Sequence, residues 1–235
     1  MSKDYYITVP GLESGSYRFV AWGGLDSELY DLSETLVPGQ TLLSDVQLHL
    51  QSIQNDTIKS NLSPLFYATH KDGIVNIKRG VSVRDTLNLT QNTYKINVTV
   101  DGLKANSDNY LISVEDNNGR YRFDNSVASQ SKFNYISPCT KVNNGTRLTS
   151  SITILRLLES RSPLLRVYDA SKGSVVFERN LVELIMLINT VGGRIDFSYM
   201  HEFDIELVAR DGIELNFDVI INGWTVVENG SGLGI

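Results

Sequence analysis

The sequence predicts an all-β protein of antiparallel sheets with one or two short helices. Apolar and polar residues alternate in "KINVTV" (95–100), "EFDIEL" (202–207) and "ELNFDVII" (214–221). Alternation of this kind is typical of half-buried strands, which bury one face and expose the other. The side chains expected to face inward are Ile96, Val98, Val100, Phe203, Ile205, Leu207, Leu215, Phe217, Val219 and Ile221.

Turn residues separate these runs and support the same fold class. Asn-Gly and Asp-Gly pairs tolerate positive φ and are strong hairpin signals between alternating segments. The pairs in this chain are Asp72-Gly73, Asp101-Gly102, Asn118-Gly119, Asn144-Gly145 and Asp211-Gly212. Many short strands joined by such turns are typical of β-sandwiches.

One helix is predicted within "RNLVELIMLIN", where Leu181, Leu184, Ile185 and Ile188 follow the helical period. Asn180 stands in the position of an N-terminal cap. The segment 43–53, "LSDVQLHLQSI", is ambiguous, because its apolar spacing suits both a helix and a strand.

The stretch "SVEDNNGRYRFDNS" (113–126) concentrates acidic and amide residues around one glycine. An EF-hand loop needs oxygen ligands at positions 1, 3 and 5, glycine at 6 and glutamate at 12. Counted from Asp116, the glycine falls at position 4, Arg120 at position 5 and Val127 at position 12. The loop therefore fails as an EF-hand.

The flanks of that stretch alternate, so the sequence favours a hairpin over a metal loop. Asn118-Gly119 is the predicted turn, and Tyr121 and Phe123 are predicted to point into the core. A looser calcium site is the alternative interpretation.

No catalytic, cofactor-binding or metal-binding residue is predicted. Cys139 is the only cysteine, and we expect a partly buried structural thiol. His49, His70 and His201 lack ligand spacing and are expected to be structural or surface residues. Phosphate-binding glycine motifs and the GxSxG nucleophile motif do not occur. The net charge of −6 and the lack of a basic cluster argue against a nucleic-acid partner.

The 235 residues suffice for two modest domains. The polar segment 88–95 precedes a clean strand, so we predict an N-terminal β-sandwich domain over 1–91 and a C-terminal one over 92–235. No run reaches the roughly 18 apolar residues of a spanning helix, and no signal peptide opens the chain.

Six segments in order resemble the FimB-type fimbrial anchor subunits of Bacteroidales. They are "PGLESGSYRFVAWGGL", "LNLTQNTYKINVTVDGL", "YLISVEDNNGRYRFDNS", "FERNLVELIM", "HEFDIELV" and "VIINGWTVVENG". The likeness runs from about residue 10 to the end and is poorest at 32–58.

The resemblance implies two tandem transthyretin-like β-sandwiches. It also implies an exported lipoprotein, acylated on an N-terminal cysteine, that anchors a fimbrial (pilus) shaft in the outer membrane and limits its length. This sequence departs from that pattern: no acylation cysteine precedes the first domain, and Cys139 is internal. We therefore expect the lipid anchor and the first strands of the first domain to be absent from this chain.

The predicted function is that of a non-catalytic cell-surface fimbrial subunit, which anchors or terminates a shaft and takes part in pilus assembly and cell adhesion. The expected partners are shaft subunits, joined by strand addition to a partly open groove in the first domain. The glycine-rich tail 230–235 is expected to be too short to act as a donor strand. The alternative function is a carbohydrate-binding surface lipoprotein, since β-sandwiches often present aromatic side chains to glycans.

Overall fold

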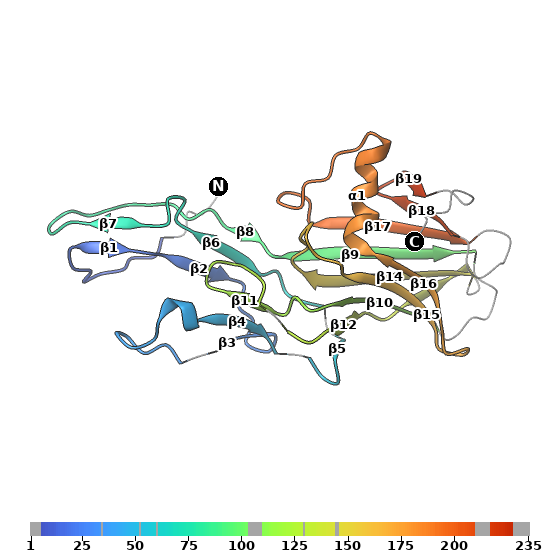
Figure 1. Cartoon of the computed structure of the whole chain (residues 1–235), viewed down its shortest axis with the longest axis horizontal. Helices are drawn as coiled ribbons and strands as arrows, with labels where there is room; N and C mark the ends of the chain where they lie inside the picture. Colours follow the sequence, from blue (N-terminus) through green and yellow to red (C-terminus); the bar gives the residue numbers. More distant parts are fainter. Residues whose placement is uncertain are drawn as a thin grey trace.

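The computed structural model describes residues 6–33, 35–51, 53–59, 61–102, 110–128, 130–143, 146–209 and 217–227. Strands dominate these residues, and a single α-helix, α1 (Leu181–Met186), occurs among them. The predicted all-β class is therefore confirmed. The molecule is elongated, with long strands at one end and short strands at the other (Figure 1).

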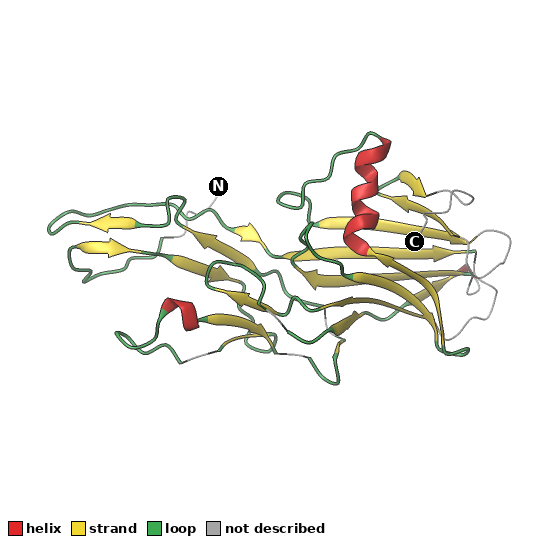
Figure 2. Ribbon diagram, viewed as in Figure 1, coloured by secondary structure: helices red, strands yellow, loops and turns green. Residues whose placement is uncertain are grey.

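Two large sheets form the C-terminal sandwich (Figures 1 and 2). One has the order β13-β14-β9-β17-β18-β19, and the other has the order β16-β15-β10-β12-β5. The first sheet comprises β13 (Thr140–Val142), β14 (Arg147–Leu155), β9 (Thr93–Asp101), β17 (Glu202–Ala209), β18 (Phe217–Ile221) and β19 (Trp224–Val227). The second comprises β16 (Ser174–Asn180), β15 (Leu164–Asp169), β10 (Tyr110–Asp116), β12 (Phe133–Ile136) and β5 (Thr57–Ile58).

Two strand pairs depart from the expected antiparallel arrangement. β17 pairs with β9 in parallel, from Glu202 opposite Lys95 to Val208 opposite Asp101. β12 and β5 are also parallel. Parallel pairing requires a long connection between the strands, and the segment between β9 and β17 includes four of the five strands of the second sheet.

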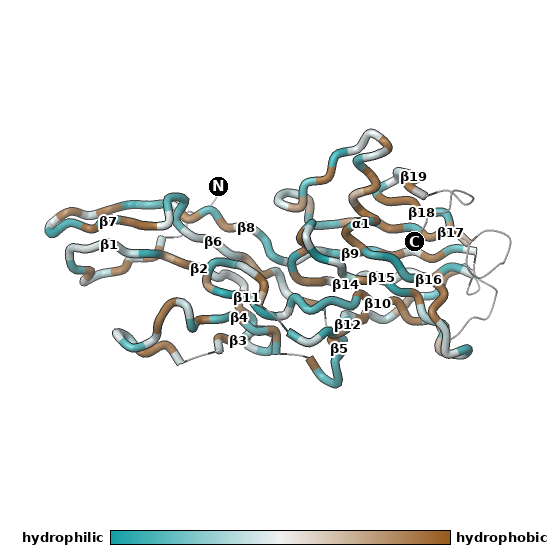
Figure 3. Tube along the Cα trace, in the orientation of Figure 1, coloured by the Kyte–Doolittle hydropathy of each residue, from teal (hydrophilic) through white to brown (hydrophobic). Residues whose placement is uncertain are grey.

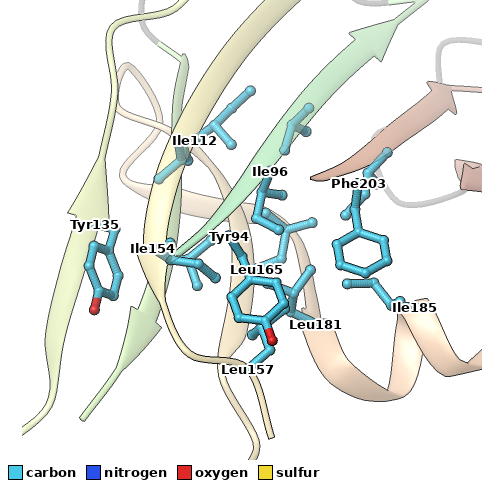
Figure 4. Close-up of a cluster of buried hydrophobic side chains, with 14 of the residues drawn as sticks. Tyr94, Ile96, Ile112, Tyr135, Ile154, Leu157, Leu165, Leu181, Ile185 and Phe203 are labelled. Atoms are coloured by element: carbon cyan, nitrogen blue, oxygen red, sulfur yellow. The ribbon is translucent and has the colours of Figure 1, made fainter. Parts of the chain in front are cut away.

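The sandwich core follows the predicted alternation. The inward-facing residues of 95–100, 202–207 and 217–221 are all at most 6% exposed. Leu215, predicted on the same face, lies outside the described residues. Figure 4 shows Ile96 and Phe203 from one sheet meeting Ile112 and Leu165 from the other. Each of these side chains is completely buried, so the two sheets share one core.

The predicted helix is confirmed together with its cap. The Asn180 side chain accepts hydrogen bonds from the backbone N–H groups of Val182 and Glu183. Leu181, Leu184 and Ile185 are buried against the sandwich, and Ile185 points toward Phe203 (Figure 4). The helix continues as the 3₁₀ segment η3 (Leu187–Val191), which ends at Gly192. Gly192 has φ +95°, a conformation that favours glycine.

The N-terminal region contains three small sheets. They are β1 (Gly15–Tyr17) with β7 (Val75–Ile77); β2 (Val20–Gly23), β6 (Phe66–Thr69) and β8 (Thr90–Gln91); and β3 (Tyr30–Leu32), β4 (Gln47–Leu50) and β11 (Arg120–Arg122). The ambiguous segment 43–53 resolves into the 3₁₀ helix η1 (Leu43–Asp45) followed by β4. Tertiary pairing with β3 and β11 selects the strand there.

The predicted hairpin across Asn118-Gly119 is wrong. β10 pairs with β12 and β15, whereas β11 leaves that sheet and pairs with β4. The backbone oxygen of Gly119 accepts a hydrogen bond from the Leu50 amide at 2.8 Å, which marks the crossing between sheets. A primed two-residue turn needs positive φ, and neither Asn118 nor Gly119 has it.

The chain instead turns a few residues later. Asn125 has φ +65°, and its amide donates to the Arg122 carbonyl. Tyr121 bridges to Val127 on the returning segment. Tyr121 is fully buried as predicted, whereas Phe123 is only half-buried.

Strands from both sides of residue 92 share sheets. β4 pairs with β11, and β5 pairs with β12. β8 ends at Gln91 and β9 begins at Thr93, so the predicted domain boundary falls between two strands. The division into 1–91 and 92–235 stays a prediction.

Candidate assembly surface

Two of the three acidic residues of the stretch 113–126 form ion pairs with neighbouring cations. Glu115 forms ion pairs with Lys132 at 2.9 Å and with Arg166 at 2.6 Å. Asp116 forms one with Arg161 at 2.8 Å. Burial alone would raise the pKa of Glu115, but the bonds from Lys132 and Arg166 outweigh it and lower that pKa. In the part of the chain that the structure describes, no cluster of three or more His, Cys, Asp or Glu side chains suits a metal ion.

Two amide residues of this stretch, Asn118 and Asn125, are structural and lie in the interior. Asn125 and Asn92 exchange two side-chain hydrogen bonds, at 2.6 and 3.1 Å, and are 6% and 0% exposed. Asn118 is also buried, and its amide oxygen accepts from the Tyr135 hydroxyl at 2.6 Å. These bonds satisfy polar groups that would otherwise be costly to bury. They tie the β11 segment to the start of the long sandwich strands.

The single cysteine and the three histidines are dispersed. Cys139 is a free, partly buried thiol, as predicted, and burial raises its pKa. His70 contacts Asp85 at 3.0 Å. His49 and His201 are half-buried, and burial lowers the pKa of both. The structure brings none of these four residues together.

One of the sheet edges in the N-terminal region is formed by β1 and β2. Among the described residues, β1 pairs only with β7 and β2 only with β6, each on one side. On an edge strand, alternate N–H and C=O groups point away from the sheet and remain available for pairing. We refer to residues 15–23 as the open edge.

Side chains along the open edge are incompletely covered. All four residues of β2 are half-buried, including Trp22, whose ring packs against Tyr67 with centroids 6.1 Å apart. The Trp22 Nε1 is buried and has no hydrogen-bond partner among the described residues. A side chain added at Gly23 would meet Phe66 at 3.6 Å and Leu89 at 3.9 Å, and Leu89 is 55% exposed. An apolar surface therefore borders β2.

Exposed apolar side chains are concentrated in the same region. Most of the large hydrophobic residues that are exposed lie before residue 92. They are Tyr6, Ile7, Val9, Leu25, Leu36, Val37, Leu42, Leu43, Ile74, Val81, Val83 and Leu89. Contiguous apolar surface is typical of regions that bind a partner, so the N-terminal region is the candidate for such a contact.

The comparisons with known proteins identify the family. Residues 2–230 match the family model of the Fimbrillin-A associated anchor proteins Mfa1 and Mfa2. The chain belongs to this family. This match confirms the fimbrial anchor family that the sequence resemblance predicted. It makes the chain a fimbrial subunit, associated with fimbriae at the cell surface.

A curated relative and two solved structures are similar to this anchor-family chain. The minor fimbrium anchoring subunit Mfa2 of Porphyromonas gingivalis is 28% identical, with coverage of 93% of this chain and 68% of the relative. The structure of the fimbrial anchor protein Mfa2 from the same species has a TM-score of 0.74 and 28% identity, covering 92% of this chain and 78% of that chain.

The second structure is of a candidate polysaccharide-binding protein from Bacteroides thetaiotaomicron. It has a TM-score of 0.81 and 21% identity, and covers 93% of this chain and 78% of that chain. At this identity, the likeness bears on the fold alone.

Sequence reasoning could not locate the open edge. The segment 15–23 has apolar residues on both faces, which shows only that both faces are partly covered. Whether a strand has one neighbour or two depends on pairing across the whole sheet. Among the described residues, no helix is long and apolar enough to cross a membrane.

Proposed function

We propose that this chain is a non-catalytic anchor subunit that terminates a fimbrial shaft at the outer membrane and takes part in fimbrial assembly and adhesion. Membership of the anchor-protein family supports the fimbrial role. The similarity to an anchoring subunit over most of the chain supports the anchoring role. Attachment to the membrane through an N-terminal lipid is part of this proposal and rests on the sequence resemblance.

The open edge is the proposed site of contact with a shaft subunit. Two observations together carry this proposal: β1 and β2 each pair on only one side among the described residues, and most of the exposed large hydrophobic residues lie before residue 92. A strand from a shaft subunit would continue the sheet by backbone hydrogen bonds, and its alternate side chains would pack beside the half-buried side chains of β2. Strand addition combines main-chain affinity with side-chain specificity, which suits assembly of a filament.

Site-specific photo-cross-linking tests the contact. A photoreactive phenylalanine analogue replaces Ser16, which is exposed on β1. The matched control carries the same analogue at Thr140, which is exposed on the edge strand β13 of the sandwich. We expect a cross-link to the shaft subunit from position 16 only. Equal cross-linking from both positions would overturn the assignment of the edge, and failure to co-purify with any shaft subunit would overturn the anchor role.

Carbohydrate binding is a second candidate function. Tyr199 is 83% exposed and Trp224 is 44% exposed, and exposed aromatic rings can stack on sugars. In the described part of the chain these two rings do not pair with each other. Glycan-array binding that is lost on Trp224→Ala would favour this function over a purely structural role.

A further inference from the structure

The turn that follows β7 projects from one end of the molecule. The Val81 amide donates to the Lys78 carbonyl at 3.1 Å, and Gly80 between them has φ +75°. A side chain added at Gly80 would meet nothing within 4 Å. The turn is therefore hydrogen-bonded internally and surrounded by open space. It lies at the end of the long axis opposite the C-terminal sandwich (Figure 1).

This turn combines exposed apolar and cationic side chains. Val81 is 56% exposed and Val83 is 47% exposed. Lys78 and Arg79 are exposed as well, and neither forms an ion pair within the described ranges. Arg84, which follows Val83, packs against the exposed Tyr6 ring, with its guanidinium 4.7 Å from the ring centroid. Two cations without an ion pair thus precede the valines on this turn, in a chain whose net charge is −6.

A second apolar loop lies toward the same end. It precedes β4 and contains the short helix η1, which buries none of its residues (Figure 2). Its exposed members are Leu36, Val37, Leu42 and Leu43, at 54%, 40%, 64% and 38%. Hydrogen bonds order the loop, since the Val37 amide donates to Thr41 Oγ1 at 2.9 Å and the Gln40 amide to the Val37 carbonyl at 3.0 Å.

Both loops interrupt otherwise polar stretches of this end with hydrophobic segments (Figure 3). Leucine and valine side chains that an ordered loop holds in water are suited to the boundary between headgroups and acyl chains. Lysine and arginine beside them are attracted to anionic lipids, by about fivefold in affinity for each charge near the surface.

We propose that this end of the molecule, formed by the loops 36–43 and 78–83, rests on the surface of an anionic lipid bilayer. The two valines and the loop leucines enter the interface, and Lys78 and Arg79 contact lipid phosphates. The contact depends neither on a covalent lipid nor on a shaft subunit. Its failure would leave strand addition at the open edge untouched.

Vesicle co-sedimentation at 0.15 M salt tests the proposal on the intact chain. The probes are vesicles of phosphatidylcholine alone and vesicles with about a third of phosphatidylglycerol, a composition that gives a strongly anionic surface. We expect the chain to pellet with the anionic vesicles and to stay in solution with the neutral ones. Raising the salt should weaken the binding, because salt screens surface charge.

The variant Lys78→Gln/Arg79→Gln should lower the partition coefficient by about 30-fold, since it removes two surface charges. The control Lys59→Gln/Arg194→Gln removes the same charge from exposed positions elsewhere and should change it by less than about twofold. Leu42→Ser/Leu43→Ser should weaken binding at low and high salt alike. Absence of binding by the unmodified chain, or equal losses in the test and control variants, would overturn the proposal. Circular dichroism confirms that each variant is folded.

Discussion

The two ends of this molecule differ in how fully their strands are paired and their apolar side chains buried. In the C-terminal sandwich, β9 lies between β14 and β17, and its apolar residues Ile96, Val98 and Val100 are at most 1% exposed. In the N-terminal region, β1 and β2 pair on one side only among the described residues, and Leu89 beside them is 55% exposed. One end completes its own core, and the other presents apolar surface and unpaired backbone.

This difference separates stability from assembly. Long strands with strict alternation bury extensive apolar surface on folding. Short strands cannot do so to the same extent, and the N-terminal sheets are tied to the sandwich by β11 and by the buried pair Asn92–Asn125. We therefore expect substitutions in the sandwich to affect folding and substitutions along the exposed surface to affect binding.

The largest expected effect is in the sandwich core. Phe203 is fully buried between the sheet and α1. Phe203→Ala should lower the free energy of unfolding by about 3–5 kcal/mol, from lost apolar contact and the cavity left behind. The matched change in the N-terminal loop, Leu42→Ala, removes a side chain that is 64% exposed and should stay within about 0.5 kcal/mol. Urea denaturation measures both, and similar losses would contradict the contrast.

The next effect is at the junction of the two regions. Asn92→Ala leaves the buried Asn125 amide without its partner and should lower the free energy of unfolding by about 1–3 kcal/mol. Removing both amides should cost less than the sum of the single changes, because no polar group is then left unpaired. A double-mutant cycle by chemical denaturation tests this, and strict additivity would show that the pair does not couple the regions.

A smaller effect is expected at the helix cap. Asn180→Ala removes the acceptor for two backbone amides of α1 and should lower the free energy of unfolding by about 1 kcal/mol. Asn180→Asp keeps an oxygen acceptor and should preserve most of the stability. Thermal unfolding followed by circular dichroism distinguishes the two variants, and an equal loss from both would rule out capping as the cause.

The smallest effect concerns pH. The pKa of Glu115 is lowered in the folded state, so its contribution is complete above the unfolded value of about 4.5. That contribution is lost as the pH falls through the lowered folded pKa. Glu115→Gln should therefore reduce stability by about 1 kcal/mol or less at neutral pH, and should have no such effect at strongly acidic pH. Denaturation series at both values check it; an equal deficit at each would contradict the ion-pair account.

The local patterns of the sequence predicted part of this fold correctly. Alternation identified the buried faces of β9, β17 and β18, and Asn180 identified the start of α1, because both signals depend on neighbouring residues. The predicted turn at Asn118-Gly119 was wrong because contacts with residues distant in the sequence determine the conformation there. Gly119 bonds to Leu50, and an added side chain there would meet Gln130 at 2.8 Å. Gly119 does not have the positive φ that the predicted turn needs.

The candidate surfaces could not be predicted from local sequence patterns for the same reason. Pairing on one side only is a property of β1 and β2 within a sheet, and exposure of Leu42 or Val81 depends on what else packs nearby. The sequence pattern around an apolar loop residue is the same whether its side chain is buried or exposed. Family resemblance predicted the fimbrial role, but it did not locate the edge.

The central claim is that the open edge receives a strand from a fimbrial shaft subunit. Amide hydrogen exchange, measured on the chain alone and on its complex with a shaft subunit, tests it most directly. The account predicts that the amides of residues 15–23 that point away from β6 and β7 exchange rapidly in the free chain and become protected in the complex, while β9 is protected in both. A complex that forms without added protection at residues 15–23 would contradict the claim.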